Sequence, residues 1–148
     1  MMEFESSVAG LSDGGAHCGL ICDASMPTWN VAHYTRDRVK GDKIPLEFLI
    51  RKQTKETAET FGLMDRGQIK EGYLADINII DHENLCVYKP EMVHDLPTGS
   101  RRIIQKAGGY IATIKSGVVT FKNDQATGEL PGTVLRGERT ADAISAQN

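Results

Sequence analysis

The residues best suited to chemistry lie near the start of the chain. Asp13 follows a short apolar run at residues 8–11, is followed by two glycines, and precedes His17 by four positions. A carboxylate that leaves a short buried strand beside a histidine is well placed to transfer a proton or bind a metal. The same pattern is also typical of a simple turn, in which Asp13 caps the turn and His17 is hydrogen-bonded within a loop. Residue types alone leave both interpretations open.

The three cysteines suggest little metal chemistry. His17, Cys18 and Cys22 could supply soft ligands, but structural zinc sites usually combine two such groups, and Cys86 is the only other cysteine. Two buried thiols in a loop are the alternative. An odd number of cysteines without a framework spacing is typical of reduced thiols, so we expect a cytoplasmic protein.

Two further groups of charged residues could form binding sites. His33 and Asp37 are four positions apart in a helical pattern and could pair on the surface of that helix. His94 and Asp95, followed by Arg101 and Arg102, could bind an anionic group. Arginines on the solvated face of a strand are the alternative for the second group.

The first half of the chain has helical patterns. Pro27 favours a helix that runs to about Lys40, Pro45 begins a second helix, and Thr54 begins a third that ends near Gly62. The apolar stripe expected along the first helix consists of Val31, Thr35 and Val39.

The second half has strand patterns. Residues 75–81 alternate polar and apolar side chains, and further strands are expected at 103–104, 110–114 and 118–121. Ser116 and Gly117 predict a hairpin turn, and Asn123 and Asp124 predict another. Residues 82–100 predict a long loop with one short strand, and residues 136–148 a flexible tail. The fold class expected is therefore α+β.

Composition excludes several classes of protein. The 148 residues are 40% hydrophobic and 25% charged, with a net charge of -3. The charges of both signs are scattered, so we expect neither nucleic acid nor a membrane surface as a partner. No apolar run approaches the roughly 20 residues that a membrane span requires, and the acidic start does not predict a signal peptide.

Taken in order, the motifs resemble the last part of N-acyl-D-amino-acid deacylases in the metal-dependent amidohydrolase superfamily. The resemblance begins with Gly-Leu-Ser-Asp-Gly-Gly-Ala-His at residues 10–17 and covers about residues 8–136. The other segments that carry it are residues 27–29, 34–37, 54–63, 65–67, 69–72, 75–78, 93–97, 117–121 and 128–132.

This resemblance implies a division of the chain. Residues 1–64 would be the end of a (β/α)8 metallohydrolase barrel, namely its eighth strand at residues 8–13 and the closing helices. Residues 65–135 would be the C-terminal share of a small β-sandwich domain, and residues 136–148 a tail. Active sites of such barrels lie at the C-terminal ends of the strands, where Asp13 would then stand.

The resemblance also implies roles for the two candidate residues. Asp13 would touch the metal site, normally zinc, act as general base on the hydrolytic water and return the proton to the departing amine. His17 would orient the site. The family's other metal ligands include a His-x-His pair, and none of the four histidines here has that spacing. We therefore expect a catalytically silent fragment without zinc at a catalytic site.

The substrate implied for the complete enzyme is an N-acyl-D-amino acid. A cyclic amide substrate and a stand-alone binding or assembly module without catalysis are the alternatives. We also expect a homo-oligomer, because barrel elements without their neighbours would expose apolar side chains. The residues expected in that exposed patch are Leu11, Trp29, Leu46, Leu49 and Ile50.

Overall fold

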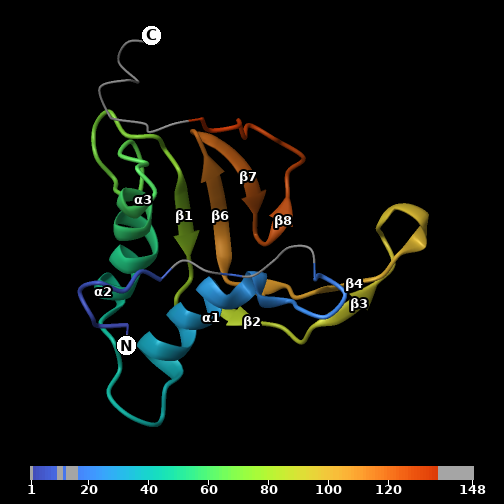
Figure 1. Cartoon of the computed structure of the whole chain (residues 1–148), viewed down its shortest axis with the longest axis horizontal. Coiled ribbons are helices and arrows are strands. Elements are labelled where there is room, and N and C mark those ends of the chain that lie inside the picture. Colours follow the sequence, from blue (N-terminus) through green and yellow to red (C-terminus); the bar gives the residue numbers. More distant parts are fainter. Residues whose placement is uncertain (1, 10–11, 13–16, 137–148) are drawn as a thin grey trace.

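The computed structural model describes residues 2–9, 12 and 17–136, and it combines helices with small antiparallel sheets (Figure 1). The α+β class is therefore confirmed. At residues 8–13, where the eighth barrel strand was expected, Val8, Ala9 and Ser12 carry no strand pairing. The other residues of that segment lie outside the described ranges.

The first helix has three consecutive parts. These are the 3₁₀ turn η1 (Asp23–Ser25), the α-helix α1 (Met26–Ala32) and the π-helical turn η2 (His33–Asp37). It ends three residues before the expected Lys40, because the backbone becomes extended at Arg38 (φ -59°, ψ 122°). Val39 is therefore 99% exposed instead of belonging to the apolar stripe. Ile44 takes its place in the core and donates its backbone N–H to the carbonyl of Tyr34 at 2.9 Å.

The second and third expected helices form one continuous rod. Its parts are α2 (Leu46–Arg51), the π-helical turn η3 (Lys52–Glu56) and α3 (Thr57–Thr60). Thr54 lies inside this rod, and its hydroxyl donates to the carbonyl of Ile50 at 2.7 Å instead of capping a helix start. Gly62, with φ 70°, ends the rod as the sequence predicted.

The main sheet has four antiparallel strands in the order β1-β6-β7-β8. These strands are β1 (Ile77–Ile80), β6 (Tyr110–Lys115), β7 (Val118–Lys122) and β8 (Gln125–Ala126). Both predicted turns are confirmed: Ser116 and Gly117 connect β6 to β7, while Asn123 and Asp124 connect β7 to β8. All four residues have positive φ, as tight two-residue hairpins require.

Two smaller pairs of strands occupy the connection between β1 and β6. The pair β2 (Cys86–Val87) and β5 (Ala107–Gly108) lies beside α1, and the pair β3 (Glu91–Val93) and β4 (Arg102–Ile104) forms an arm that projects from the body (Figure 1). A 3₁₀ turn, η4 (Pro97–Gly99), lies in the tip of the arm. The loop at residues 82–100 thus contains two short strands instead of the one expected.

The core joins the helical and β parts. Leu49 (0% exposed) and Leu85 (1% exposed) lie at its centre, with Val31, Ala32 and Ile44 around them. Leu49 was expected in an exposed patch, and that expectation is wrong because α2 packs its apolar face against α1. Trp29 is 45% exposed, in line with the same expectation, while Leu11 lies outside the described residues.

A network of ion pairs connects the end of the rod to the main sheet. Asp65 is fully buried and pairs with Arg66 at 2.8 Å, and Arg66 also lies 3.5 Å from Asp76. Asp76 in turn pairs with Lys115 of β6 at 2.9 Å. This chain of alternating charges fixes the start of β1 against the end of β6. No helix within the described ranges is long and apolar enough to span a membrane.

Candidate functional site

Of the two candidate residues from the sequence, Asp13 and His17, the structure describes only His17. Asp13 lies outside the described residues. His17 is exposed and begins a turn in which its carbonyl accepts hydrogen bonds from the backbone N–H groups of Leu20 (2.8 Å) and Ile21 (2.9 Å). The site is therefore built from the described segments on either side of Asp13.

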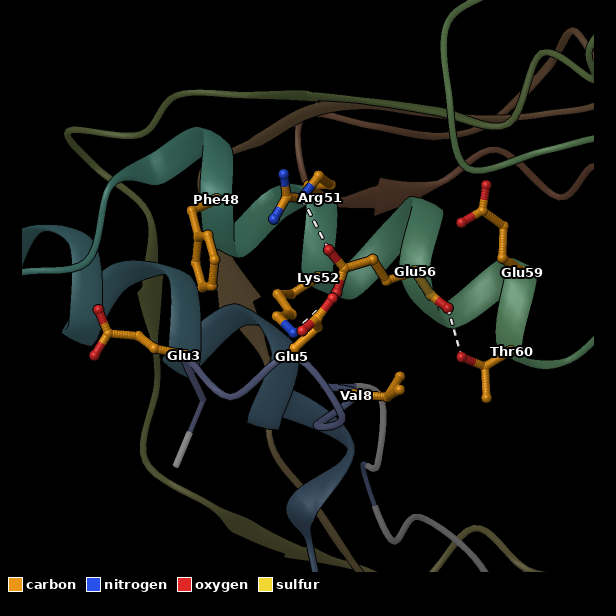
Figure 2. A pocket seen from close by; sticks show the side chains of 9 residues that line it. All are labelled: Glu3, Glu5, Val8, Phe48, Arg51, Lys52, Glu56, Glu59 and Thr60. Atoms are coloured by element: carbon orange, nitrogen blue, oxygen red, sulfur yellow. Dashed lines mark hydrogen bonds and ion pairs between the residues drawn. The ribbon is translucent and has the colours of Figure 1, made fainter.

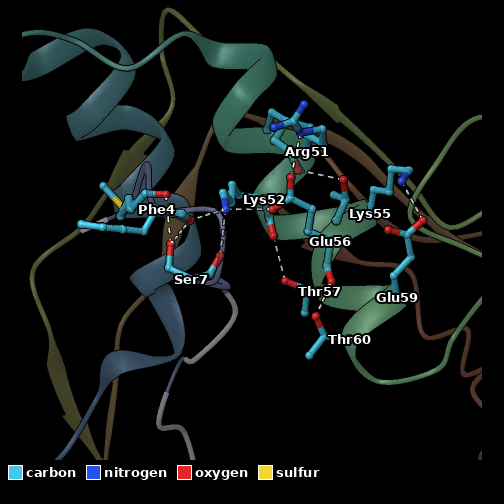
Figure 3. A network of polar contacts seen from close by, with 12 residues as sticks. Phe4, Ser7, Arg51, Lys52, Lys55, Glu56, Thr57, Glu59 and Thr60 are labelled. Atoms are coloured by element: carbon cyan, nitrogen blue, oxygen red, sulfur yellow. Dashed lines mark hydrogen bonds and ion pairs between the residues drawn. The ribbon is translucent and has the colours of Figure 1, made fainter.

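The segment before Asp13 is fixed to the helical rod. Lys52 is 3% exposed, and its ammonium donates to the carbonyls of Phe4 (3.0 Å) and Ser7 (2.9 Å), as Figure 3 shows. The hydroxyl of Thr57, one turn further on, lies 3.1 Å from the carbonyl of Ala9. Because these contacts involve the backbone, they hold the course of the chain just before the candidate base.

The positive charge of Lys52 is neutralised by a carboxylate. Glu56, four positions along the rod, places a carboxylate oxygen 2.9 Å from the ammonium of Lys52. This hydrogen bond holds the pKa of Glu56 below its ordinary value. A buried ammonium is tolerated here because one carboxylate and two carbonyls replace its hydration.

The segment after Asp13 is fixed to the arm. The backbone N–H of Ile103 in β4 donates to the carbonyl of Cys18 at 2.6 Å. Ser25, just before α1, hydrogen-bonds Gln105, whose amide also donates to the carbonyl of Tyr88 at 2.9 Å. The turn that begins at His17 is thus held from the β part, whereas residues 2–9 are held from the rod.

An open pocket of about 580 Å³ lies between residues 3–8 and the rod (Figure 2). Its lining residues are Glu3, Glu5, Val8, Phe48, Arg51, Lys52, Glu56, Glu59 and Thr60. Among the described residues, His17 is not part of this pocket, and the basic groups Arg51 and Lys52 are already paired with Glu56. The pocket is therefore the gap between the N-terminal segment and the rod, and its described lining offers no unpaired basic group for catalysis.

The other histidines are placed apart from His17. His33 stacks on Trp29 with ring centroids 4.4 Å apart, and His82 hydrogen-bonds the hydroxyl of Thr35 at 2.7 Å. His94 lies exposed in the arm. Asp37 pairs with its neighbour Arg36 at 2.6 Å, and among the described residues no ion pair joins it to His33, the pairing that the sequence had left open.

A catalytic metal does not fit the part of the chain that the structure describes. Within residues 2–9, 12 and 17–136, no three His, Cys, Asp or Glu side chains come together as ligands would. The cysteines Cys18, Cys22 and Cys86 are free thiols. A zinc site of the type implied by the resemblance would need ligands other than these residues.

Sequence reasoning missed two side chains that hold separate segments of the chain together. Lys52 was not singled out from the sequence, although it follows Leu49 by three positions, which places both side chains on the same side of the rod. Arg36 binds the backbone of residues 82–85, and no signal in the sequence revealed that contact.

Comparisons with known proteins agree with the resemblance. Residues 1–121 match the family model described as "Amidohydrolase family". The D-aminoacylase of Alcaligenes xylosoxydans xylosoxydans is 33% identical over 105 residues, which are 71% of this chain and 19% of that protein. The chain thus spans about a fifth of the length of the curated relative it matches. No solved structure matches the chain significantly.

Proposed function

This chain belongs to the amidohydrolase family, and from that premise we propose that it forms part of an enzyme that hydrolyses the amide bond of N-acyl-D-amino acids. The observation that carries the proposal is the 33% identity to a D-aminoacylase over 71% of the chain. A cyclic amide substrate has no observation in its favour.

The proposal assigns the chemistry to Asp13 and His17. Asp13 takes a proton from the attacking water and later gives it to the leaving amine, as a general base and acid. His17 orients the reacting groups from four residues away. The hydrogen bonds from Lys52 to Ser7 and from Ile103 to Cys18 hold the described segments that precede and follow Asp13 in the sequence.

The architecture proposed follows the division expected from the sequence. Residues 1–64 supply the last strand and closing helices of a (β/α)8 barrel, and residues 65–135 supply part of a β-sandwich. The chain alone is proposed to be inactive, because it spans about a fifth of the relative's length. Its three free thiols support a reducing, cytoplasmic location.

A chimera tests this function. The matching segment of this chain would replace its counterpart in the Alcaligenes D-aminoacylase, and hydrolysis of N-acetyl-D-amino acids would be measured. We expect an active chimera in which Asp13→Asn lowers kcat by about 10²–10⁴-fold, the usual contribution of general-base catalysis. His17→Asn should lower kcat less.

Two controls make the chimera informative. Circular dichroism and bound zinc should be the same in the Asp13→Asn and parent chimeras. Activity that survives Asp13→Asn within a few-fold, or that falls only because zinc is lost, would contradict the role of Asp13 as a base. A folded chimera without activity would contradict the proposed function itself.

A further inference from the structure

A second pocket, of about 510 Å³, lies at one end of the main sheet. Its walls come from the small pair β2–β5 and its flanking residues, from β6 and β7, and from the turn that leads into β8 (Figure 1). The lining residues are Tyr88, Lys106, Ala107, Tyr110, Thr113, Phe121, Asn123, Asp124 and Gln125, all within the described ranges. A cavity of this size accommodates a small molecule.

One wall of this pocket continues the ladder of β2 and β5. The backbone N–H of Tyr88 donates to the carbonyl of Lys106 at 2.9 Å, so these two residues lie opposite each other just beyond the paired strands. Opposite residues of an antiparallel pair project to the same side, and both side chains line the pocket. The carbonyl of Tyr88 also accepts a hydrogen bond from the amide of Gln105 at 2.9 Å. Both backbone groups of Tyr88 are therefore held.

The ring of Tyr88 lies close to the backbone of Gly108. Its hydroxyl oxygen is 2.6 Å, and its Cε2 and Cζ atoms are 3.1 Å, from the point where a side chain on Gly108 would begin. The absence of a side chain on Gly108 thus leaves room for the ring in this position. The hydrogen bond with Cys86 raises the pKa of Tyr88, so the phenol is neutral at pH 7 and does not repel an anion.

The opposite wall belongs to the main sheet. Phe121 pairs with Thr113 across β6 and β7, and its ring is 45% exposed. The carboxylate of Asp124 accepts the backbone N–H groups of Gly109 (3.3 Å) and Tyr110 (2.9 Å), which holds the turn before β8 against the start of β6. The half-exposed ring of Phe121 beside a cavity is available for stacking.

Lys106 supplies the charge of the pocket. Its side chain is exposed and makes no ion pair or hydrogen bond with any described residue. Asp124, by contrast, directs its carboxylate oxygens to backbone donors. The side-chain amides of Asn123 and Gln125 also have no partner within residues 2–9, 12 and 17–136. An ammonium and two amides beside aromatic rings are complementary to an anionic group carried by a flat ring.

We propose that this pocket binds a small aromatic carboxylate. The ring of the ligand packs against Tyr88 and Phe121, and its carboxylate pairs with the ammonium of Lys106. Charge complementarity selects the acid, because an uncharged analogue cannot form the pair with Lys106. Offset or edge-to-face contacts with the two rings select an aromatic ligand over an aliphatic one. The inference goes beyond the proposed function and uses none of the residues assigned to it.

A titration of the full chain followed by nuclear magnetic resonance tests this proposal. The probe is indole-3-acetate, and the comparison compounds are the uncharged indole-3-acetamide and the non-aromatic cyclohexylacetate. We expect indole-3-acetate to shift the backbone amide signals of residues 106–110 and 121–125 in a saturable way. Each comparison compound should bind at least about threefold more weakly, since each lacks one of the two kinds of contact.

Three variants test the individual contacts. Lys106→Gln should weaken binding of indole-3-acetate to the level of the acetamide, and Phe121→Leu should weaken it about threefold. Gly108→Ala should also weaken it, because the added methyl group displaces the ring of Tyr88, while the backbone of Gly108 has no positive φ that would strain alanine. The matched control is Lys89→Gln, which removes an exposed lysine that is not among the lining residues and should leave the affinity unchanged.

The absence of saturable shifts at residues 106–110 and 121–125 would overturn the proposal. Equal affinities of the parent chain for indole-3-acetate and its acetamide, or of the parent and Lys106→Gln chains for indole-3-acetate, would reject a carboxylate ligand. Equal affinities for indole-3-acetate and cyclohexylacetate would reject an aromatic one. Unchanged amide signals of β1 in each variant show that the fold is retained, so that a weaker affinity reports on the pocket.

Discussion

Lys52 shows how a single residue can organise this molecule. Its ammonium is almost fully buried and lies within 3.0 Å of three oxygens, from Phe4, Ser7 and Glu56. Removing it would leave those oxygens without their common hydrogen-bond donor. The stability of the N-terminal segment therefore depends on this side chain more than on any pair at the exposed surface of the rod.

We expect Lys52→Met to lower the free energy of unfolding by about 1–3 kcal/mol, because the buried lysine is the shared donor to the carbonyls of Phe4 and Ser7 and to the carboxylate of Glu56. The measurement is urea denaturation followed by circular dichroism. The matched control is Lys55→Met, which removes a half-exposed pair with Glu59 and should cost about 0–1 kcal/mol. Equal losses in the two variants would show that the contacts of Lys52 with the N-terminal segment are unimportant.

Glu56 makes the ion pair with Lys52 sensitive to acid. Its pKa is lowered in the folded protein by the hydrogen bond from Lys52. A lowered folded pKa adds stability above the unfolded value of about 4.3, and that stability is lost as the pH falls through the folded pKa. We expect the parent chain to lose more stability than Glu56→Gln between about pH 5 and pH 3. Parallel urea midpoints for the two proteins over this range would contradict the prediction.

At the scale of elements, Arg36 adds a set of hydrogen bonds between the helical and β parts. Arg36, in the π-helical turn η2, donates to the carbonyls of His82, Glu83 (2.9 Å) and Leu85 (2.8 Å), and to the carboxylate of Asp37. The hydroxyl of Thr35 donates to the carbonyl of Val31, so it accepts a hydrogen bond from His82. These contacts fix the loop before β2 on the end of the first helix.

Arg36→Lys should weaken this connection, because an ammonium cannot match a guanidinium that serves several carbonyls at once. We expect a loss of about 1–3 kcal/mol in unfolding free energy and faster hydrogen exchange at residues 82–88. Arg38→Lys is the control, since the carbonyls that Arg38 binds within the described residues, those of Lys40 and Asp42, belong to its own loop. Unchanged exchange at residues 82–88 in Arg36→Lys would disprove the proposed connection.

At the scale of the whole molecule, the main sheet has an apolar face. The pairing places Ile77 opposite Ile114 and Ile114 opposite Val119, with Ile79 opposite Ala112. Paired residues project to the same side of a sheet. Ile79 (46%) and Val119 (39%) are nonetheless partly exposed. The contact of the expected homo-oligomer was placed on the barrel part from the sequence, and we propose this face of the sheet as the contact instead.

Light scattering at micromolar concentration tests this association. The parent chain should be dimeric or larger, and Val119→Lys should shift it toward the monomer because a charge would be buried at the contact. Val39→Lys is the control, since Val39 is 99% exposed in a loop away from the sheet. A monomeric parent chain, or a Val119→Lys chain that associates like the parent, would reject this interface.

Local patterns in the sequence predicted most of the elements. The strand at residues 77–80, the hairpin at Ser116 and Gly117 and the turn at Asn123 and Asp124 follow from alternation and from residues that accept positive φ. Such signals act over a few residues, so no tertiary contact is needed to read them. The helix ends were less accurate, because the first helix stops where Ile44 returns to the core, and that is a tertiary contact.

The sequence by itself determined the family of this protein, its α+β class and its candidate residues Asp13 and His17, since ordered motifs and local periodicity are carried by the chain alone. Only the tertiary structure decided that Leu49 is buried, that Lys52 and Arg36 hold separate segments together, and that the backbone N–H of Ile103 binds the carbonyl of Cys18. These features depend on contacts between residues from about 45 to more than 80 positions apart. The energies of such contacts arise from burial and from shared hydrogen bonds, which have no signature in the spacing of residue types.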